Sequence, residues 1–354
     1  MTTSYVDLRS DTVTRPTPAM RAAMAEAEVG DDNFEEDPTV RLLEEETAAV
    51  LGKEAALFVP SGCMGNEVAI AAQTRRGDLI LLDRLSHVVQ VEEEAVTALL
   101  GRRFLFLDGD RGRLRPEGVA AVLSGNESSE SRLGLVEVEN THNHGSGAIY
   151  PLAQLRGVSL AAKRRGLPVH LDGARIWNAS AATGIAPSEY AACADTVMVC
   201  FSKGLGAPLG SAVAGSAAFV REAREVRRAF GGAMRQVGIV AAGALHGLRH
   251  HRERIPEDHR RARRLAEAIA EMPGLRVNPA EIETNIVIAE LAAGAERLNG
   301  FVDALAAEGI LVIPFGGPAR FRCVAHLDVD DESLDRSIDA LRRVAGAFAA
   351  APRS

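Results

Sequence analysis

The first two hundred residues alternate between short apolar runs and longer helical patterns, and this alternation restricts the fold more than any other feature. Apolar runs at 55–59, 79–82, 135–138, 169–171 and 197–201 are each short enough to be a buried strand. Helical periodicity begins at Pro18 and at Pro38, and again near Cys63 and near Glu92. Strands that alternate with helices build parallel sheets, so we expect an α/β fold with a mostly parallel sheet wrapped by helices.

A chain of 354 residues is long for one core, and a second domain is therefore expected. A helical pattern from about 235 to 253 would connect the sheet domain to a smaller C-terminal α/β domain. That domain would contain strands at 285–289 and 321–326 and a final helix from about Asp331. We divide the chain into an N-terminal segment with a large domain, residues 1–245, and a small C-terminal domain, residues 246–354.

Composition argues against several kinds of partner. The net charge of −8 offers no basic surface for nucleic acid or an anionic membrane, and no segment approaches the roughly 20 apolar residues of a membrane span. The four cysteines lie far apart without a CxxC pair, so no zinc site or disulfide framework is indicated, and we assign no metal. The N-terminus carries charge where a signal peptide needs an apolar core, so we expect a cytoplasmic protein.

Two charged residues follow apolar runs at positions where a site is expected. Asp172 ends one run and Lys203 follows another. In open α/β sheets, ligands bind beyond the carboxyl ends of the strands. Pyridoxal phosphate chemistry needs a lysine amine that forms a Schiff base with the cofactor aldehyde, and a carboxylate that keeps the pyridine nitrogen protonated. The residues around the lysine are small, which leaves room for a flat cofactor: Ser202, Gly204 and Gly206.

A glycine-bearing turn, Pro60-Ser-Gly-Cys-Met-Gly-Asn66, lies between an expected strand and an expected helix. Its exposed amides and the positive end of the helix suit a phosphate. Most glycine turns merely reverse the chain, so the turn is weak evidence alone. Together with Lys203 and Asp172 it makes Gly62 and Cys63 candidates for binding the cofactor.

Short motifs along nearly the whole chain resemble one family. They are Asp7-Leu-Arg-Ser-Asp-Thr-Val-Thr14, Val29-Gly-Asp-Asp32, Glu36-Asp-Pro-Thr39, Gly52-Lys-Glu-Ala-Ala56, Glu139-Asn-Thr-His-Asn143, His170-Leu-Asp-Gly-Ala-Arg-Ile176, Ser202-Lys-Gly-Leu-Gly206 and Met234-Arg-Gln236. In this order they resemble the low-specificity L-threonine aldolases, which are fold-type I pyridoxal phosphate enzymes. The resemblance implies the fold-type I architecture and a pyridoxal phosphate cofactor. It also implies a homo-oligomer, a tetramer, in which neighbouring subunits share active sites.

The resemblance also implies roles at the cofactor. Lys203 would hold it as a Schiff base, Asp172 would face the pyridine nitrogen, and His87 would stack on the ring. Arg228 and Arg235 would reach a cofactor phosphate across a subunit boundary.

On the substrate side, the resemblance places Arg175 and Arg322 near the carboxylate, with Ser10 assisting, and Arg175 also lies close to the cofactor. Forked donors of this kind suit a carboxylate. His87 and His142 are both candidates for handling the β-hydroxyl proton, because an imidazole titrates near neutral pH, and the sequence leaves the choice open.

The implied reaction is retro-aldol cleavage of L-threonine, L-allo-threonine and related L-β-hydroxy-α-amino acids to glycine and an aldehyde, which is acetaldehyde for threonine. One alternative is another fold-type I reaction: transaldolation, β-elimination or transamination. A second alternative is a non-catalytic module that binds pyridoxal phosphate or an amino acid.

Several positions depart from the family pattern. Cys63 stands where threonine is usual, which replaces a hydroxyl donor to the phosphate with a weak thiol donor and predicts weaker retention of the cofactor. Phe34 and Glu35 replace a usual tyrosine and a common glycine, so the role of that acidic loop is in doubt. The run Glu92-Glu-Glu94 is also more acidic than expected, and the sequence gives no mechanistic account of it.

Overall fold

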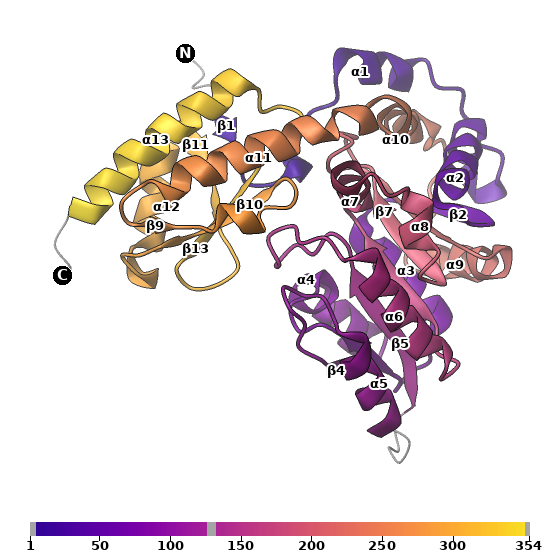
Figure 1. Cartoon of the computed structure of the whole chain (residues 1–354). Coiled ribbons are helices and arrows are strands. Elements are labelled where there is room, and N and C mark those ends of the chain that lie inside the picture. The colour runs from indigo at the N-terminus through magenta and orange to yellow at the C-terminus, as the bar shows by residue number, and fades with distance from the viewer. Residues whose placement is uncertain (1–4, 126–131, 351–354) are drawn as a thin grey trace.

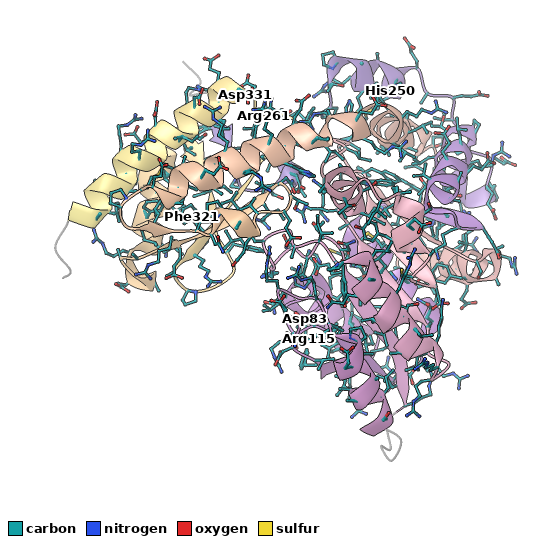
Figure 2. All side chains as sticks on the ribbon, viewed as in Figure 1. Asp83, Arg115, His250, Arg261, Phe321 and Asp331 are labelled. Carbon is teal, nitrogen blue, oxygen red and sulfur yellow. The ribbon has the colours of Figure 1, made fainter. Side chains whose placement is uncertain are left out.

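The structure is a computed structural model that describes residues 5–125 and 132–350. The chain forms a larger part, drawn from indigo to salmon, and a smaller part of orange and yellow C-terminal elements (Figure 1). Side chains fill the space between ribbons within each part (Figure 2).

A seven-stranded sheet forms the centre of the large part, with strand order β2-β8-β7-β6-β5-β3-β4. Neighbouring strands are parallel except where β8 pairs with β2 and β7. The strands are β2 Ala55–Val59, β3 Leu79–Leu82, β4 Arg103–Phe106, β5 Leu133–Glu139, β6 Val169–Gly173, β7 Thr196–Cys200 and β8 Ser211–Gly215. The predicted α/β class with a mostly parallel sheet is confirmed.

Two strands of this sheet lie outside the predicted apolar runs. β8 is built from Ser, Ala, Val and Gly, and so lacks the bulky residues that mark a buried strand in a sequence. β4 lies at the sheet edge, begins with an exposed arginine and is only partly buried. Small size and partial exposure explain why periodicity missed them.

Both faces of the sheet are buried, as a parallel sheet requires. Successive side chains of a strand point to opposite faces. In β7, Val197 and Val199 lie in one hydrophobic cluster, while Met198 and Cys200 lie in another. α3 and α9 pack together and cover the second face at β2, β7 and β8.

The helices of the large part alternate with these strands. They are α1 Pro18–Ala25, α2 Pro38–Leu51, α3 Gly62–Gln73, α4 His87–Glu94, α5 Pro116–Gly125, α6 Leu152–Lys163, α7 Ile176–Thr183, α8 Pro187–Ala191, α9 Ala217–Ala229 and α10 Gly238–His250. Prolines at the starts of α1 and α2 follow N-caps Thr17 and Asp37, whose side chains accept backbone hydrogen bonds. The predicted helix starts at Pro18 and Pro38 are confirmed.

The small part has its own sheet and core. Its sheet has the order β12-β13-β10-β9 and is antiparallel at every pairing. A further parallel pair joins β1 to β11. The elements are β1 Val6–Asp7, α11 Ile255–Ala270, β9 Leu275–Arg276, β10 Ile286–Leu291, α12 Leu298–Ala307, β11 Ile310–Leu311, β12 Ile313–Pro314, β13 Arg320–Val324 and α13 Asp331–Ala350.

The N-terminal segment contributes to the core of the small part. Val6 and Leu8 are buried in one cluster with residues of β10, β13, α11 and α13, among them Phe321, which Figure 2 labels. The division at 245/246 remains a prediction.

The helical pattern predicted from 235 to 253 is not one helix. α10 ends at His250, a 3-10 turn spans Arg252–Arg254, and α11 begins at Ile255. Pro256 sits in the first turn of α11, because its missing N–H prevents a helix from running through it. α11 therefore makes the connection to the small part (Figure 1). The run at 124–131 has no apolar residues and is rich in turn formers, which predicts a surface loop, and it lies largely outside the described residues. Among the residues described, no helix has the length and apolar character to cross a bilayer.

Candidate active site

Lys203 and Asp172 lie at the carboxyl ends of two neighbouring strands. Asp172 is the penultimate residue of β6 and pairs with Met198 of β7, and Lys203 follows the end of β7. The Nζ atom of Lys203 donates to Cys200 Sγ at 3.2 Å. The charge of Lys203 also acts on the pKa of Asp172, which places both groups in one electrostatic environment. The structure therefore brings together the two residues that the sequence singles out.

The chain contains only three lysines, Lys53, Lys163 and Lys203. Lys53 donates to the carbonyl of Ala194 at 2.6 Å, and Lys163 is exposed at the end of α6. Lys203 is thus the one lysine at the strand ends, which makes it the sole side-chain amine placed for covalent attachment of an aldehyde there.

Asp172 is buried and held in its charged form. Its Oδ1 accepts from the Ala174 amide at 2.9 Å, and its Oδ2 accepts from Asn66 Nδ2 at 2.8 Å. Burial alone would raise the pKa of Asp172, but the charges of His87 and Lys203, together with these hydrogen bonds, lower it below its ordinary value. A buried carboxylate that stays ionised suits a protonated pyridine nitrogen.

A chain of side chains behind Asp172 fixes the orientation of Asn66. The Oδ1 atom of Asn66 lies 3.1 Å from His170 Nε2, and His170 Nδ1 lies 2.9 Å from Thr196 Oγ1. Burial lowers the pKa of His170 to about 4, so this imidazole is neutral and carries one proton. With that proton on Nε2 donating to Asn66 Oδ1, the amide NH₂ of Asn66 must face Asp172.

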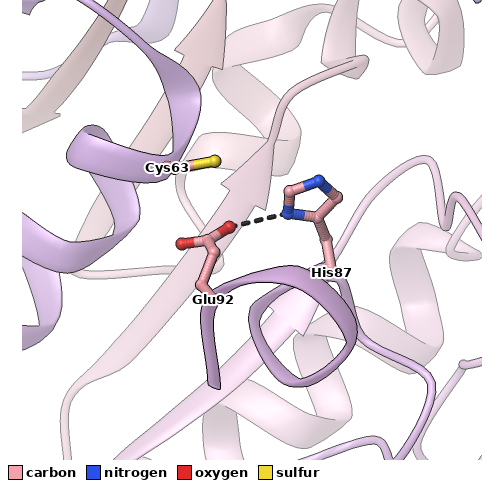
Figure 3. Close-up of side chains that lie close together, drawn as sticks. All are labelled: Cys63, His87 and Glu92. Atoms are coloured by element: carbon pink, nitrogen blue, oxygen red, sulfur yellow. Dashed lines mark hydrogen bonds and ion pairs between the residues drawn. The ribbon is translucent and has the colours of Figure 1, made fainter. Parts of the chain in front are cut away.

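His87 starts α4 and faces a buried carboxylate of the same helix. Its Nδ1 lies 2.6 Å from Glu92 Oε1 (Figure 3). Its backbone amide donates to Glu139 Oε2 at 2.8 Å. Burial lowers the pKa of His87, but the hydrogen bond to Glu92 and the charge of Asp172 outweigh it and raise the pKa overall. The side chain stays partly exposed and faces the region between α3 and the strand ends.

The turn before α3 lies next to the lysine. Ser61 caps the helix by accepting from the Met64 amide at 3.2 Å, and the first-turn amides lack intrahelical acceptors. A Cβ at Gly62 would come within 2.9 Å of Cys200 Sγ, so only glycine lets the turn approach the end of β7 this closely. The resulting cradle of amides at a helix N-terminus suits a phosphate. Burial, and then the charge of Glu92, raise the pKa of Cys63 to about 12, so its thiol stays protonated.

Two buried arginines lie on the side of the site that faces the small part. Arg175 makes a forked contact with Asp11, at 2.7 Å for both bonds. Arg322 donates to Asn143 Oδ1 at 2.9 Å and to the Arg9 carbonyl, and its guanidinium lies 4.1 Å from the ring centre of Phe315. Burial and the nearby charge of Arg175 lower the pKa of Arg322 to about 10. Arg322 is paired with neutral groups, so it retains capacity for an anion.

His142 occupies a more enclosed position than His87. It is fully buried, and its Nδ1 accepts from the Gly145 amide at 3.0 Å. Its Nε2 lies 3.5 Å from Glu139 Oε2 and 3.7 Å from Asp83 Oδ1. A Cβ at Gly112 would overlap the ring at 2.1 Å, so that glycine packs directly on the imidazole.

Other predicted residues lie elsewhere. Ser10 accepts hydrogen bonds from the amide and hydroxyl of Thr12, at 3.2 and 2.8 Å, and precedes the Asp11 that binds Arg175. Arg228 pairs with Glu225 and Arg235 with Asp31, and both arginine side chains are mostly exposed. The structure places neither of these two arginines at the strand ends beside Lys203.

The acidic loop adopts a tight turn at the position of a common family glycine. Glu35 has φ 59° and ψ 31°, the left-handed region that glycine favours. Phe34 is 67% exposed, and the neighbouring Asp32 pairs with buried Arg227 at 2.9 Å. The loop is thus anchored through Asp32 to α9, while Phe34 projects outward.

The residues present fit pyridoxal phosphate. One lysine amine, one ionised buried carboxylate, a partly exposed imidazole and a glycine-lined helix N-terminus surround one region. The hydrogen-bond partners of buried Arg322 are neutral oxygens of Asn143 and Arg9, which leaves its charge available to an anionic ligand.

Asn66 and Glu92 are among the residues of this site that the sequence did not reveal. Asn66 ends the glycine-bearing turn, and only the fold shows that its amide reaches Asp172. Glu92 belongs to an acidic run that looks solvated in the sequence, yet its side chain is buried while Glu93 and Glu94 are exposed. The only sequence signal was its spacing of five residues from His87.

Cys63, His87 and Glu92 form the one group of possible metal ligands in the described part of the chain whose ligand atoms lie within 4.8 Å of one another (Figure 3). His87 and Glu92 already form a hydrogen bond of 2.6 Å, with a proton between these two candidate ligands. A cation would have to displace that proton and the proton of the Cys63 thiol.

Comparison with known proteins agrees with this geometry. The β-eliminating lyase family model matches residues 7–292. Low-specificity L-threonine aldolase 1 of Arabidopsis thaliana is 39% identical over 346 residues, covering 96% of each chain. The low specificity L-threonine aldolase of Escherichia coli is 34% identical and covers 93% of this chain and 96% of its own.

The fold matches as well. The threonine aldolase structure from Leishmania major has a TM-score of 0.79 at 19% identity, with 96% of this chain and 99% of that chain covered. The chain is therefore a pyridoxal phosphate-dependent lyase that belongs to the β-eliminating lyase family, among the low-specificity L-threonine aldolases.

Proposed function

We propose that the chain cleaves L-threonine, L-allo-threonine and related L-β-hydroxy-α-amino acids to glycine and an aldehyde. The observation that carries the proposal is the placement of Lys203, the one lysine at the strand ends, in the same buried environment as ionised Asp172. The names of the Arabidopsis and Escherichia coli relatives support the same reaction.

When bound, the cofactor supplies an electron sink for the bond that breaks next to the amino group. Lys203 would supply the amine that holds the cofactor aldehyde. Asp172, held by Asn66 and Ala174, would keep a proton on the pyridine nitrogen. The first-turn amides of α3, from Gly62 and Cys63, would bind the phosphate.

Arg322 is the substrate carboxylate anchor in this proposal. Its protein partners are the neutral oxygens of Asn143 and Arg9, whereas Arg175 is already neutralised by Asp11. Arg175 and Ser10 then act mainly by holding Asp11 and the N-terminal segment beside the site. A fixed carboxylate sets the angle of the Cα–Cβ bond to the cofactor ring, which decides which bond breaks.

His87 is the group that exchanges a proton with the substrate β-hydroxyl. Its side chain is partly exposed, whereas the His142 ring is enclosed and its Nδ1 already accepts from Gly145. His142 then shapes the wall of the site rather than moving a proton. The imidazole of His87 would also stack on the cofactor ring.

Subunit association and location follow as further parts of the proposal. A homotetramer with shared sites is supported by the exposed Arg228 and Arg235, which would meet a cofactor phosphate of the neighbouring subunit. A cytoplasmic location is supported by the four cysteines, all of which are free.

The decisive test uses purified protein with pyridoxal phosphate and each threonine stereoisomer separately. Glycine and acetaldehyde in equal amounts from the L isomers support the proposal. Ammonia with a keto acid would instead identify β-elimination, and cofactor binding without turnover would identify a non-catalytic module.

A further inference from the structure

Glu92 is a buried carboxylate that the mechanism above does not use. It is 3% exposed, although it lies in a run of three glutamates whose other two members are exposed. Burying an ionisable side chain is unfavourable unless it is paired, so its place inside the protein needs a partner. Its partners are His87 and Asn66.

Both partners bind the same oxygen of Glu92. His87 Nδ1 lies 2.6 Å from Oε1, and Asn66 Nδ2 donates to Oε1 at 3.1 Å, while Oε2 is buried without a hydrogen-bond partner. Because Asn66 Nδ2 can only donate, Oε1 acts as an acceptor. With Glu92 ionised, Oε1 can only accept, so the nitrogen of His87 that faces it carries the proton.

That hydrogen bond decides the state of the other ring nitrogen. With a proton on Nδ1, a neutral His87 has an unprotonated Nε2 that can accept a proton from substrate. When Nε2 takes that proton, the imidazolium forms next to the Glu92 carboxylate. Burial raises the pKa of Glu92, whereas the hydrogen bonds from His87 and Asn66 act in the opposite direction and stabilise its charged form.

We propose that Glu92 is a positioning residue for catalysis: through Oε1 it holds a proton on Nδ1 of His87, presents Nε2 to the substrate β-hydroxyl and stabilises the imidazolium that forms. The proposal rests on the function proposed above. A proton moves from the substrate hydroxyl to Nε2 as the Cα–Cβ bond breaks, and no further reactant is needed.

Several other charged groups face the pair and enter its pH dependence. They are Cys63 and Glu67 on α3, Glu137 and Glu139 on β5, Asp172 on β6, and His144 after β5. Of these, Cys63 and Glu137 have pKa values that burial raises, which favours their neutral forms. Asp172 and Glu139 are retained in every variant below.

Two substitutions separate the charge of Glu92 from its role as an acceptor. Glu92→Gln keeps an oxygen for His87 and Asn66, with its new NH₂ at the place of the unpartnered Oε2, and removes only the charge. Glu92→Leu removes the acceptor as well. Glu93→Gln, one residue along and exposed, is the matched control.

The first readout needs no turnover. In the apoprotein, NMR titration should place the pKa of His87 lower in Glu92→Gln than in Glu93→Gln by about one unit, since the loss of a neighbouring charge has effects of this order. An unchanged His87 titration would overturn the proposal. This result does not depend on threonine cleavage. A failure of the proposal for Glu92 can therefore be distinguished from a failure of the proposed function.

The second readout is kinetic. In Glu92→Gln the acid limb of kcat/KM should move to lower pH, with kcat reduced roughly tenfold and KM for threonine nearly unchanged; Glu92→Leu should lose roughly a hundredfold or more in kcat. Both variants should retain the cofactor. Parallel loss of kcat and cofactor, or activity equal to Glu93→Gln, would contradict a positioning role. One tightly bound metal ion per wild-type chain, absent from Glu92→Gln, would overturn it in favour of a metal site.

Discussion

The Nδ2 atom of Asn66 lies 2.8 Å from Oδ2 of Asp172, and this contact fixes the carboxylate that the proposed chemistry depends on. The same amide donates to Glu92 at 3.1 Å. One side chain of α3 thus spans the groups assigned to the two ends of the reaction, the electron sink and the proton acceptor. Asp172 and Glu92 therefore share one hydrogen-bond donor, Asn66, and a shift of either carboxylate disturbs the contact of the other.

Asp172→Asn should lower kcat by roughly two to three orders of magnitude while the fold is kept. Both oxygens of Asp172 accept hydrogen bonds, so the variant must also turn an NH₂ toward one of these donors or toward the cofactor. Steady-state rates and circular dichroism check this. Wild-type turnover by a correctly folded variant would show that Asp172 does not serve the cofactor nitrogen.

Cys63→Thr should tighten cofactor binding about fivefold, since a hydroxyl donor in place of a thiol is worth about 1 kcal/mol. The half-buried Cys63 opens the helix whose amides are assigned to the phosphate. Cofactor dissociation of Cys63→Thr is compared with that of Cys63→Ala, which has no donor. Equal dissociation constants for the two variants would place Cys63 away from the phosphate.

Glu137 should make the protein less stable as pH rises. It is fully buried on β5 without a hydrogen-bond partner for either oxygen, and burial raises its pKa well above the ordinary value. The native state therefore keeps a proton that the unfolded chain loses above a pH of about 4.3. The contribution of Glu137 to the free energy of unfolding is fully present below that pH. Above it, this contribution falls by up to about 1.4 kcal/mol per pH unit, until the carboxyl ionises in the folded protein as well.

Glu137→Gln, which cannot ionise, should remove this dependence, so its stability relative to wild type should rise between pH 5 and pH 8. Urea unfolding at a series of pH values measures the difference, with Glu93→Gln as the exposed control. A constant offset between variant and wild type across the series would refute the buried protonated carboxyl.

Glu35→Gly should stabilise the protein by about 1 kcal/mol, because Glu35 holds a left-handed backbone conformation that costs a side chain about this much. Its ion pair with Arg224 is long, at 3.6 Å, and the Glu35 side chain is mostly exposed, so the pair contributes little. Glu36→Gly, next to it but without a positive φ, should destabilise instead. Thermal unfolding of the two variants should move in opposite directions, and a shared direction would rule out strain at Glu35.

How much the sequence predicts differs between fold and site. Strands β2 and β3 and helix α2 match the predicted ranges, since their residues repeat with clear periods and their ends carry caps or turns. The predicted helix from 235 to 253 covers α10 and the 3-10 turn after it, whereas the connection to the small part is made by α11, which begins only at Ile255. β8 was missed because its small residues give no apolar signal in the sequence, although its backbone pairs with β2 and β7.

Within the site, residues that follow strands were predictable and residues that act through them were not. Asp172 and Lys203 are marked by their strands, and the arginines and histidines by motifs. Asn66 contacts Asp172, which lies 106 residues away in the sequence, and Asp11 contacts Arg175, which lies 164 residues away. Glu92 contacts His87 at a separation of five residues. Only the packing of α3 and α4 and of the N-terminal segment against the strand ends brings such residues together.

The central claim is that Lys203 holds the cofactor for cleavage of threonine, and covalent mapping tests it most directly. Borohydride reduction of the cofactor-loaded protein, followed by proteolysis and mass spectrometry, reports which of Lys53, Lys163 and Lys203 is modified. The account predicts the cofactor on Lys203, and a loss of glycine formation by roughly a thousandfold or more in Lys203→Ala but not in Lys163→Ala. Cofactor on another lysine, or threonine cleavage by Lys203→Ala at the wild-type rate, would contradict it.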